Sequence, residues 1–220
     1  MDAAETLRLF DEQMRRGAVG PDGLLVEDGW AGVLWPPADG DVEPLVERLR
    51  GLTGHVEWKY FSHDGPALRE RLHAAGLVPE AEETVVVTAT ASLPPPPAGV
   101  DLREEPEAFS ELAAQVFGRP VPLPANAIAV VACVEGRPVS GGRVDLEPGV
   151  EFAGLFGGAT LAAFRGRGLY RATVARRAEL ARERGYRWLY AEALPSSRPI
   201  LERLGFTAIT STTPYVFPPA

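Results

Sequence analysis

The stretch Phe164-Arg165-Gly166-Arg167-Gly168-Leu169-Tyr170-Arg171 decides how the rest of the chain is interpreted. It follows a predicted strand over residues 150–161 and opens a predicted helix over residues 170–184. The free N–H groups and partial positive charge of a helix start attract phosphate, and glycines let the backbone approach a ligand closely. Because three arginines add positive charge, the sequence predicts a phosphate-binding loop here.

The spacing within this loop argues against two well-known phosphate-binding motifs. A dinucleotide-binding fingerprint needs a third glycine where the chain has Arg171, and too little chain follows to complete a doubly wound sheet. A Walker A loop needs Gly-Lys-Ser/Thr, which the segment lacks. The remaining alternative is a helix start that two glycines ease, with arginines that only face solvent.

The second half of the chain alternates strands and helices. Strands are predicted over residues 100–104, 127–134, 138–145, 150–161, 187–194, 206–210 and 213–217, and helices over residues 106–118, 170–184 and 197–204. This order predicts an α/β domain with a mixed sheet.

A proline-rich segment over residues 93–99 divides the chain, because four consecutive prolines can continue neither a helix nor a central strand. We therefore expect an α/β domain over residues 1–92 and a second domain over residues 100–220. In the first half, a strand at Trp58 and a helix ending before Gly76 parallel the strand at Trp188 and the helix ending before Gly205. A degenerate repeat and the general likeness of α/β units explain this equally well.

The loop spacing Arg165-x-x-Gly168, the helix behind it and the later Leu-x-x-Leu-Gly-Phe over residues 201–206 resemble the GNAT superfamily of N-acetyltransferases. The resemblance covers residues 100–217. It implies a GNAT-like mixed sheet flanked by helices, which a smaller α/β half precedes. If that half is a degenerate GNAT-like repeat, it should lack a CoA site, because Asp39 and Asp41 before its helix would repel a pyrophosphate. The resemblance also implies acetyl-CoA as cosubstrate.

The resemblance further implies which residues contact the cosubstrate. In this family the strand before the loop splays from its neighbour and pairs with the pantetheine arm, which assigns that arm to Gly158, Ala159 and Thr160. The pyrophosphate would lie on Arg165, Gly166, Arg167, Gly168, Leu169 and Tyr170. Ser197 stands near a position whose polar residues contact CoA in the family, although capping the short helix is a simpler role.

Two positions depart from the family pattern. Tyr170 stands where the loop usually closes with glycine or alanine, and Leu201 stands where a tyrosine often serves as general acid. Because an amine acceptor must be deprotonated and the leaving thiolate must gain a proton, another acid and a base are needed. We expect Glu192 as the base, since it is the only carboxylate on its strand, and Tyr190 on the same strand face as the acid.

Weaker candidates remain for the same chemistry. Glu151, at the start of the CoA strand, is a second choice of base, and Tyr215 is another tyrosine that could act as acid. Each of these residues also has an ordinary structural interpretation, as a surface glutamate or a core aromatic side chain.

The composition limits partners and location. A net charge of −8 disfavours nucleic acid, no apolar run is long enough to span a membrane, and the histidines show no metal-ligand spacing. The single cysteine, Cys133, suits a buried apolar position in a cytosolic protein. The sequence thus predicts a cytoplasmic N-acetyltransferase for a small-molecule amine, without metal, and leaves a homodimer open. The alternative is a non-catalytic acyl-CoA-binding or regulatory protein.

Overall fold

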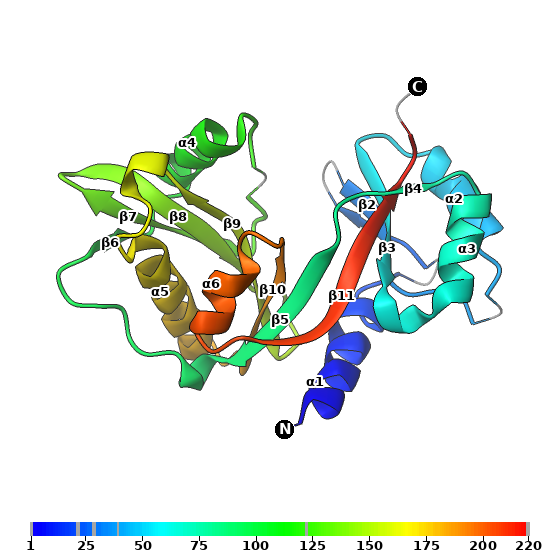
Figure 1. Cartoon of the computed structure of the whole chain (residues 1–220), viewed down its shortest axis with the longest axis horizontal. Coiled ribbons are helices and arrows are strands. Elements are labelled where there is room, and N and C mark those ends of the chain that lie inside the picture. Colours follow the sequence, from blue (N-terminus) through cyan, green and yellow to red (C-terminus); the bar gives the residue numbers. More distant parts are fainter. Residues whose placement is uncertain (1, 21–22, 28–29, 39, 122, 219–220) are drawn as a thin grey trace. The chain divides into compact units, whose positions relative to one another are not determined.

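The computed structural model describes residues 2–20, 23–27, 30–38, 40–121 and 123–218 of the chain. These residues form two compact units (Figure 1). The first unit comprises Met1–Val85, Ala193–Pro199 and Ala208–Ala220, and the second comprises Val86–Glu192 and Ile200–Thr207. Among the described residues, no helix is long and apolar enough to cross a bilayer.

The second unit is a mixed sheet with a helix on each face. Its strands are β6 (Asp101–Arg103), β7 (Ala127–Val134), β8 (Arg137–Asp145), β9 (Phe152–Thr160) and β10 (Trp188–Ala193), in the order β10-β9-β8-β7-β6. The β9–β10 pair is parallel and the other pairs are antiparallel. Helices α4 (Pro106–Phe117) and α5 (Leu169–Glu183) both pack on β7, β8 and β9. The predicted α/β mixed sheet is confirmed.

Apolar periodicity places helix α4 as the sequence predicts. Phe109, Leu112 and Ala113 are buried against β7 and β9, together with Cys133, which is 5% exposed. Gly118 ends the helix in the left-handed conformation (φ 71°), where a side chain would be strained. Burial raises the pKa of the Cys133 thiol, as expected of a small apolar core residue.

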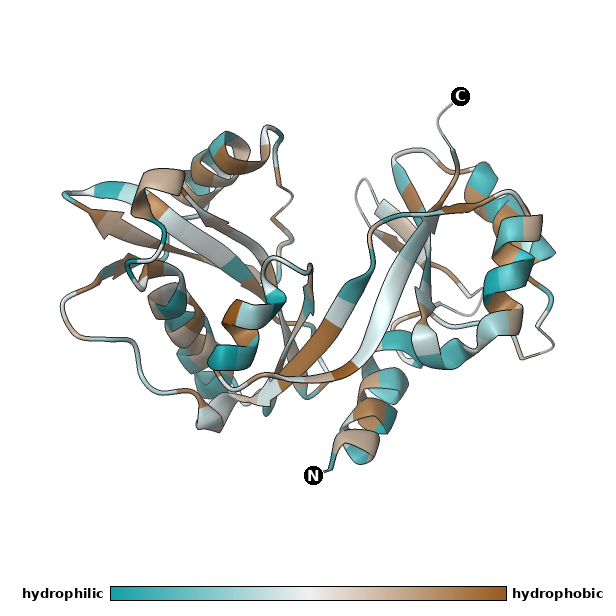
Figure 2. Cartoon of the chain, in the orientation of Figure 1, coloured by the Kyte–Doolittle hydropathy of each residue, from teal (hydrophilic) through white to brown (hydrophobic). Residues whose placement is uncertain are grey.

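The first unit is built around a parallel strand pair. Its elements are α1 (Ala3–Phe10), η1 (Asp11–Arg16), β1 (Leu25–Glu27), β2 (Trp30–Val33), α2 (Glu43–Arg50), β3 (His55–Phe61), η2 (Ser62–Asp64), α3 (Pro66–Ala74) and β4 (Val78–Pro79). Strands β2 and β3 run parallel, with β1 antiparallel to β2. Helices α1 and α3 carry both hydrophilic and hydrophobic residues, as amphipathic helices do (Figure 2).

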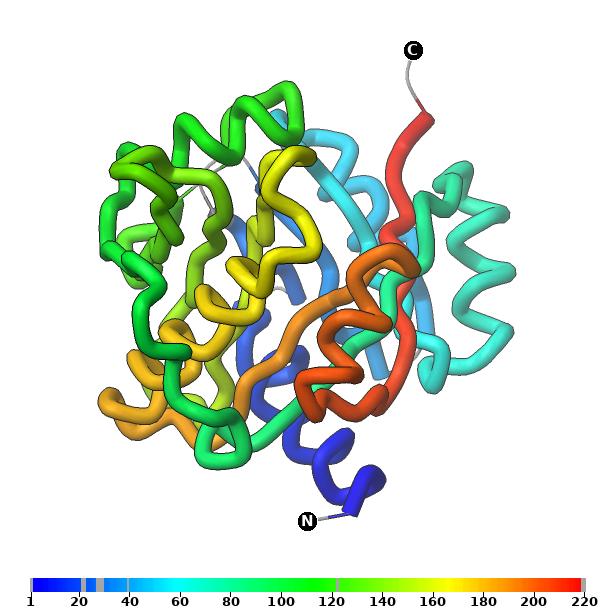
Figure 3. The backbone as a smooth tube through the Cα atoms, turned by 60° about the vertical axis from the view of Figure 1, so that its left-hand side comes forward, coloured from blue at the N-terminus to red at the C-terminus, as the bar shows by residue number. Residues whose placement is uncertain are grey.

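The C-terminal strand differs from the sequence-based expectation of two short strands. The chain ends in one strand, β11 (Thr207–Val216), and not in two strands over residues 206–210 and 213–217. Its residues from Thr212 to Val216 pair antiparallel with β3 (Figures 1 and 3). Thr212 is fully buried and its hydroxyl donates to the carbonyl of Tyr60 at 3.2 Å. Thr212, which lies between the two predicted strands, is thus part of a continuous ladder, because β-branched threonine fits a strand.

The division of the chain also differs from the expected boundary at residues 93–99. The N-terminal segment of the first unit ends at Val85, inside strand β5 (Glu83–Ala89), and residues 93–99 belong to the second unit. Residues 208–220 belong to the first unit, because β11 pairs with β3 and β4. Backbone pairing between distant segments, and not the proline run, sets the units.

The proposed repeat holds for the order of elements but not for the residues matched. Both units contain a parallel βαβ segment followed by a helix, namely β2-α2-β3-α3 and β9-α5-β10-α6, where α6 is Arg198–Arg203. Trp58 is fully buried in a cluster with α2 residues. Trp188 pairs in register with Phe152 and is only partly buried, while its neighbour Leu189 is fully buried. Trp58 and Trp188 therefore differ in their surroundings.

Candidate active site

The loop before α5 has the conformation that its glycines were expected to permit. Gly166 (φ 74°) and Gly168 (φ 78°) both adopt left-handed backbone conformations, which side chains disfavour. A Cβ atom added at either glycine would meet no atom within 4 Å, so the space in front of the backbone is open. No side chain caps the helix at Gly168. The first-turn N–H groups of α5 are left for an anion.

The arginines of this loop are exposed and form no ion pair with the described residues that would neutralise their positive charge. Arg165, Arg167 and Arg171 are exposed, and within the described part of the chain none of them has a carboxylate within 4.0 Å. Arg165 donates through Nε to the carbonyl of Thr160 at 3.3 Å, and the guanidinium of Arg167 lies 5.2 Å from the ring centroid of Phe164. Both contacts orient the side chains without neutralising them.

Strands β9 and β10 separate beside this loop. Their parallel pairing runs from Trp188 opposite Phe152 to Tyr190 opposite Gly154, and then stops. Yet β9 continues to Thr160 and β10 continues to Ala193. The last residues of both strands therefore lie beyond the shared ladder, and the facing backbone groups of β9 are open to an extended ligand.

A β-bulge accounts for the bend of β9. Gly141 on β8 faces Ala159, and Arg143 faces Phe156, so two residues of β9 lie opposite one residue of β8. Gly157, one of these two, has φ 62°, which favours glycine. Because a bulge bends its strand and increases the local twist, β9 is free to turn away from β10 after this point.

The three residues assigned to pantetheine differ in how they could contact it. Gly158 is exposed. Ala159 is 2% exposed, and its side chain belongs to the core under α4. Thr160 bonds through its hydroxyl to Ser140 Oγ at 2.8 Å. Only backbone groups of Ala159 are therefore suited to hold a ligand.

The unusual Tyr170 is accommodated by a glycine on β9. A Cβ atom at Gly158 would lie 2.8 Å from the Cε2 atom of Tyr170, so the ring rests where a side chain would otherwise stand. Tyr170 also lies beside Arg177, whose guanidinium is 5.8 Å from the ring centroid. The tyrosine thus turns towards the strand, and the loop keeps its open side.

Arg177 packs beside Tyr170 from the interior of the second unit. It is fully buried, and it donates through Nε to the carbonyl of Thr173 at 3.0 Å and through Nη1 to the carbonyl of Arg143 at 3.1 Å. Burial lowers the pKa of its guanidinium. Gly142 makes room for it, because a Cβ there would lie 2.5 Å from Nη1.

The predicted catalytic pair lies on the sheet face opposite α5. Tyr190 and Glu192 are both half-buried, while the alternate residues Leu189, Ala191 and Ala193 are buried. The Tyr190 ring makes edge contacts with Phe152 and Phe156, at centroid distances of 6.4 and 5.8 Å. Glu192 follows the last β9–β10 pair, so its backbone belongs to the separated part of β10.

Other candidates are placed less favourably. Glu151 forms an ion pair with Arg187 at 2.7 Å and precedes β9. Ser197 belongs to the first unit, and its hydroxyl donates to the carbonyl of Leu194 at 3.1 Å, within its own turn. Tyr215 also belongs to the first unit, where it pairs with Trp58 on β3. Leu201 is 2% exposed and therefore a core residue.

Sequence reasoning missed a partly buried ion pair on the same sheet face. Arg143 donates to Asp145 at 2.8 Å, and its guanidinium lies 5.2 Å from the ring centroid of Phe156. Burial raises the pKa of the Asp145 carboxyl, and the neighbouring Arg143 opposes that rise. Charged residues alternating with apolar Val144 in a strand were the available signal. Among the described residues, no three potential metal ligands cluster.

Comparison with known proteins supplies the fold but no sequence relative. No protein family matches the chain by sequence, and no curated protein matches it. A GCN5-related N-acetyltransferase from Kribbella flavida is similar in structure with a TM-score of 0.70 and 19% identity, over 99% of this chain and 95% of that chain. One from Sphaerobacter thermophilus has a TM-score of 0.59 and 18% identity, over 97% of this chain and 84% of that chain.

A third similar structure is a GNAT-family protein from Novosphingobium aromaticivorans, with a TM-score of 0.62 and 17% identity, over 96% of this chain and 97% of that chain. All three likenesses extend over both units. The chain therefore has the fold of the GCN5-related N-acetyltransferases along nearly its whole length.

Proposed function

We propose that this chain, which has the GNAT fold, is an N-acetyltransferase that moves the acetyl group of acetyl-CoA to a primary amine of a small molecule. The observation that carries the proposal is the separation of β9 from β10 beside an uncapped helix start with three available arginines. A fold alone does not specify chemistry, so the proposal depends on the strand separation and the helix start.

The residues present fit acetyl-CoA. The N–H groups at the start of α5, with Arg165 and Arg167, would hold the pyrophosphate. The backbone of β9 after Gly157 would pair with the pantetheine arm, in the manner of an added strand. The thioester would then lie near the point where the two strands part, next to Tyr190 and Glu192.

Glu192 would take the proton that the ammonium group of the acceptor must lose before attack. The amine nitrogen then bonds to the carbonyl carbon, and the carbon–sulfur bond breaks. Tyr190 would supply a proton to the departing thiolate and regain one from the nitrogen, which must lose its second proton to become an amide. Tyr190 would thus take the role of the tyrosine that the family often has where this chain has Leu201. We place the reaction in the cytosol.

The loop assignment is tested by the variant Gly168→Glu. The new side chain adds a negative charge where the pyrophosphate would bind, so calorimetry should show loss of measurable CoA affinity. Gly149→Glu is the matched control, because Gly149 also has a positive φ (83°) and no atom within 4 Å of an added Cβ. It carries the same backbone strain at a distant turn. Equal CoA affinity in both folded variants would refute the assignment.

The second candidate function is a non-catalytic acyl-CoA-binding protein. The observation that favours it is Leu201, a buried core residue where a general acid is often found. Turnover of acetyl-CoA against simple amines, aminoglycosides and peptides, followed by release of the free thiol, separates the two. We expect amine-dependent thiol release. CoA binding without turnover on any acceptor would favour the binding protein.

A further inference from the structure

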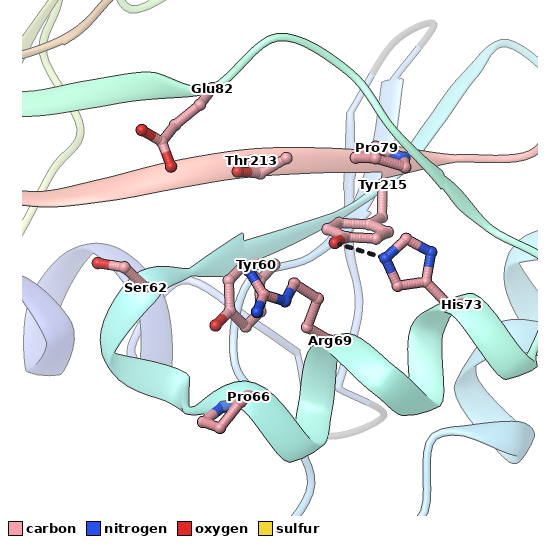
Figure 4. Close-up of a pocket in the computed structure, with 9 residues that line it drawn as sticks. All are labelled: Tyr60, Ser62, Pro66, Arg69, His73, Pro79, Glu82, Thr213 and Tyr215. Atoms are coloured by element: carbon pink, nitrogen blue, oxygen red, sulfur yellow. Dashed lines mark hydrogen bonds between the residues drawn. The ribbon is translucent and has the colours of Figure 1, made fainter.

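The first unit contains a pocket that the proposed acetyl transfer does not use. It has a volume of about 550 Å³ and lies between the end of β3, helix α3 and strand β11 (Figure 4). The side chains that define it are Tyr60, Arg69, His73, Glu82, Thr213 and Tyr215. The volume falls in the range of small-molecule sites.

The floor of this pocket is aromatic and already in place. The rings of Tyr60 and Tyr215 meet edge to face at a centroid distance of 6.0 Å. His73 lies against Tyr215 at a centroid distance of 5.2 Å, and its Nε2 is 3.3 Å from the tyrosine hydroxyl. The hydroxyl of Tyr60 donates to the carbonyl of Gly65 at 3.3 Å. Tyr60 and Tyr215 are both buried, with 7% and 2% of their surface exposed, so they form the closed base of the pocket and offer little ring surface to a ligand.

Arg69 supplies a cation on one side of the pocket. It projects from α3 towards Tyr60 in the view of Figure 4. It is exposed, and within the described ranges no acceptor or carboxylate lies within bonding distance of it. Burial raises the pKa of Tyr215, and the charge of Arg69 opposes that rise, which reflects how close the two side chains lie. The fork of the guanidinium is available for a carboxylate.

Glu82 supplies an anion on the other side. It extends into the pocket from the chain segment before β5, across from α3 (Figure 4). The hydroxyl of Ser211 donates to it at 3.2 Å, and no cationic side chain of the described residues lies within 4.0 Å. Arg69 and Glu82 therefore line one pocket without forming an ion pair with each other.

We propose that this pocket is a second ligand site, which binds a small amphoteric molecule such as an amino acid or dipeptide. The ligand carboxylate pairs with Arg69 and its ammonium group pairs with Glu82, above the buried side chains of Tyr60 and Tyr215. A purely anionic ligand would leave Glu82 facing a like charge, and a purely cationic ligand would do the same to Arg69.

Three probes of similar shape test the assignment. Phenylalanine carries both charges, 2-phenylethylamine lacks the carboxylate, and 3-phenylpropionate lacks the ammonium group. Titrations of the full chain followed by NMR should show phenylalanine binding roughly tenfold or more tighter than either probe, since each loses one charged hydrogen-bonded contact. The dipeptide Phe-Gly keeps both charges at a wider spacing and serves as a second positive probe.

Two variants assign each charge to its partner. Arg69→Gln should remove the advantage of phenylalanine over 2-phenylethylamine, and Glu82→Gln should remove its advantage over 3-phenylpropionate. The matched controls are Arg8→Gln and Glu70→Gln, which change exposed charges outside the pocket. Both controls should leave the affinities unchanged.

Several results would overturn the proposal. Absence of binding by both phenylalanine and Phe-Gly at millimolar concentration would do so, and so would equal binding of 3-phenylpropionate and phenylalanine, which would indicate an anion site. Unchanged affinities in Arg69→Gln and Glu82→Gln would place the ligand elsewhere. The outcome is separate from the acetyltransferase assignment, because the titrations contain no CoA and Gly168→Glu should bind phenylalanine normally.

Discussion

At the residue scale, Glu192 is where the proposed chemistry is most sharply testable. Its side chain lies on the half-buried face of β10, at the part of the strand that β9 no longer pairs with. Glu192→Gln keeps the size of the side chain but removes the base, so kcat should fall roughly a hundredfold at neutral pH. CoA affinity should stay nearly unchanged, because the pyrophosphate would bind at α5.

Glu151→Gln is the matched control for this prediction. Glu151 is paired with Arg187 before the start of β9, and its loss should leave kcat within a factor of about two. Wild-type turnover in Glu192→Gln would show that Glu192 is an ordinary strand residue. A fall in both variants would instead indicate a general loss of structure at this edge of the sheet.

At the element scale, η1 holds a charge cluster that should make the first unit acid-sensitive. Arg15 is buried, and it pairs with Asp11 at 2.8 Å and with Asp64 at 2.6 Å. His63 Nε2 also lies 2.9 Å from Asp11. Burial pulls the pKa of Asp11 up, but the hydrogen bonds from His63 and Arg15 outweigh it and the pKa is lowered. A lowered carboxyl pKa gives stability that is present above the ordinary aspartate range and lost as the pH falls through the lowered value.

Asp11→Asn should therefore lower the free energy of unfolding by about 2 kcal/mol at neutral pH, and this difference should shrink below about pH 4. Urea unfolding followed by tryptophan fluorescence is a suitable measurement, because Trp30, Trp35 and Trp58 all lie in the first unit. Glu12→Gln, which removes only an exposed charge, is the control. A difference that stayed constant from pH 7 to pH 2 would contradict the ionic explanation.

At the scale of the whole molecule, two units of similar element order should bind one CoA and not two. The segment before α2 ends in Asp41, whose carboxylate accepts from the N–H of Glu43 at 3.2 Å and so occupies that helix start. Arg16 lines the same pocket as Asp41, but its guanidinium lies over the ring of Trp35 at 4.7 Å. Asp39, the other carboxylate of the segment before α2, lies outside the described residues.

Calorimetry should give a stoichiometry of one CoA per chain, and Gly168→Glu should abolish it. Two CoA per chain in the wild type, with one site retained in Gly168→Glu, would show that the first unit has a site of its own. The reason for expecting one is electrostatic, since a carboxylate at a helix start repels a pyrophosphate that the free N–H groups of α5 would attract.

The sequence by itself determined the features that depend on neighbouring residues. Glycines 166 and 168 at a helix start, the apolar spacing in α4 and the alternation in β10 specify their local conformations because each depends on backbone geometry over a few residues. The loop and the strand face of Glu192 and Tyr190 were therefore predictable. The family resemblance supplied the expectation of a mixed sheet flanked by helices.

Only the tertiary structure decided what depends on contacts between distant segments. Pairing of β11 with β3 assigned the C-terminus to the first unit, although the proline run suggested otherwise. Tyr170 keeps the phosphate loop open because Gly158, on another strand, gives its ring a place. Trp58 and Trp188 match in sequence, yet Trp58 is fully buried among side chains of α2 and Trp188 is only partly buried. The burial of a strand face depends on which helix covers it, and no local pattern records that.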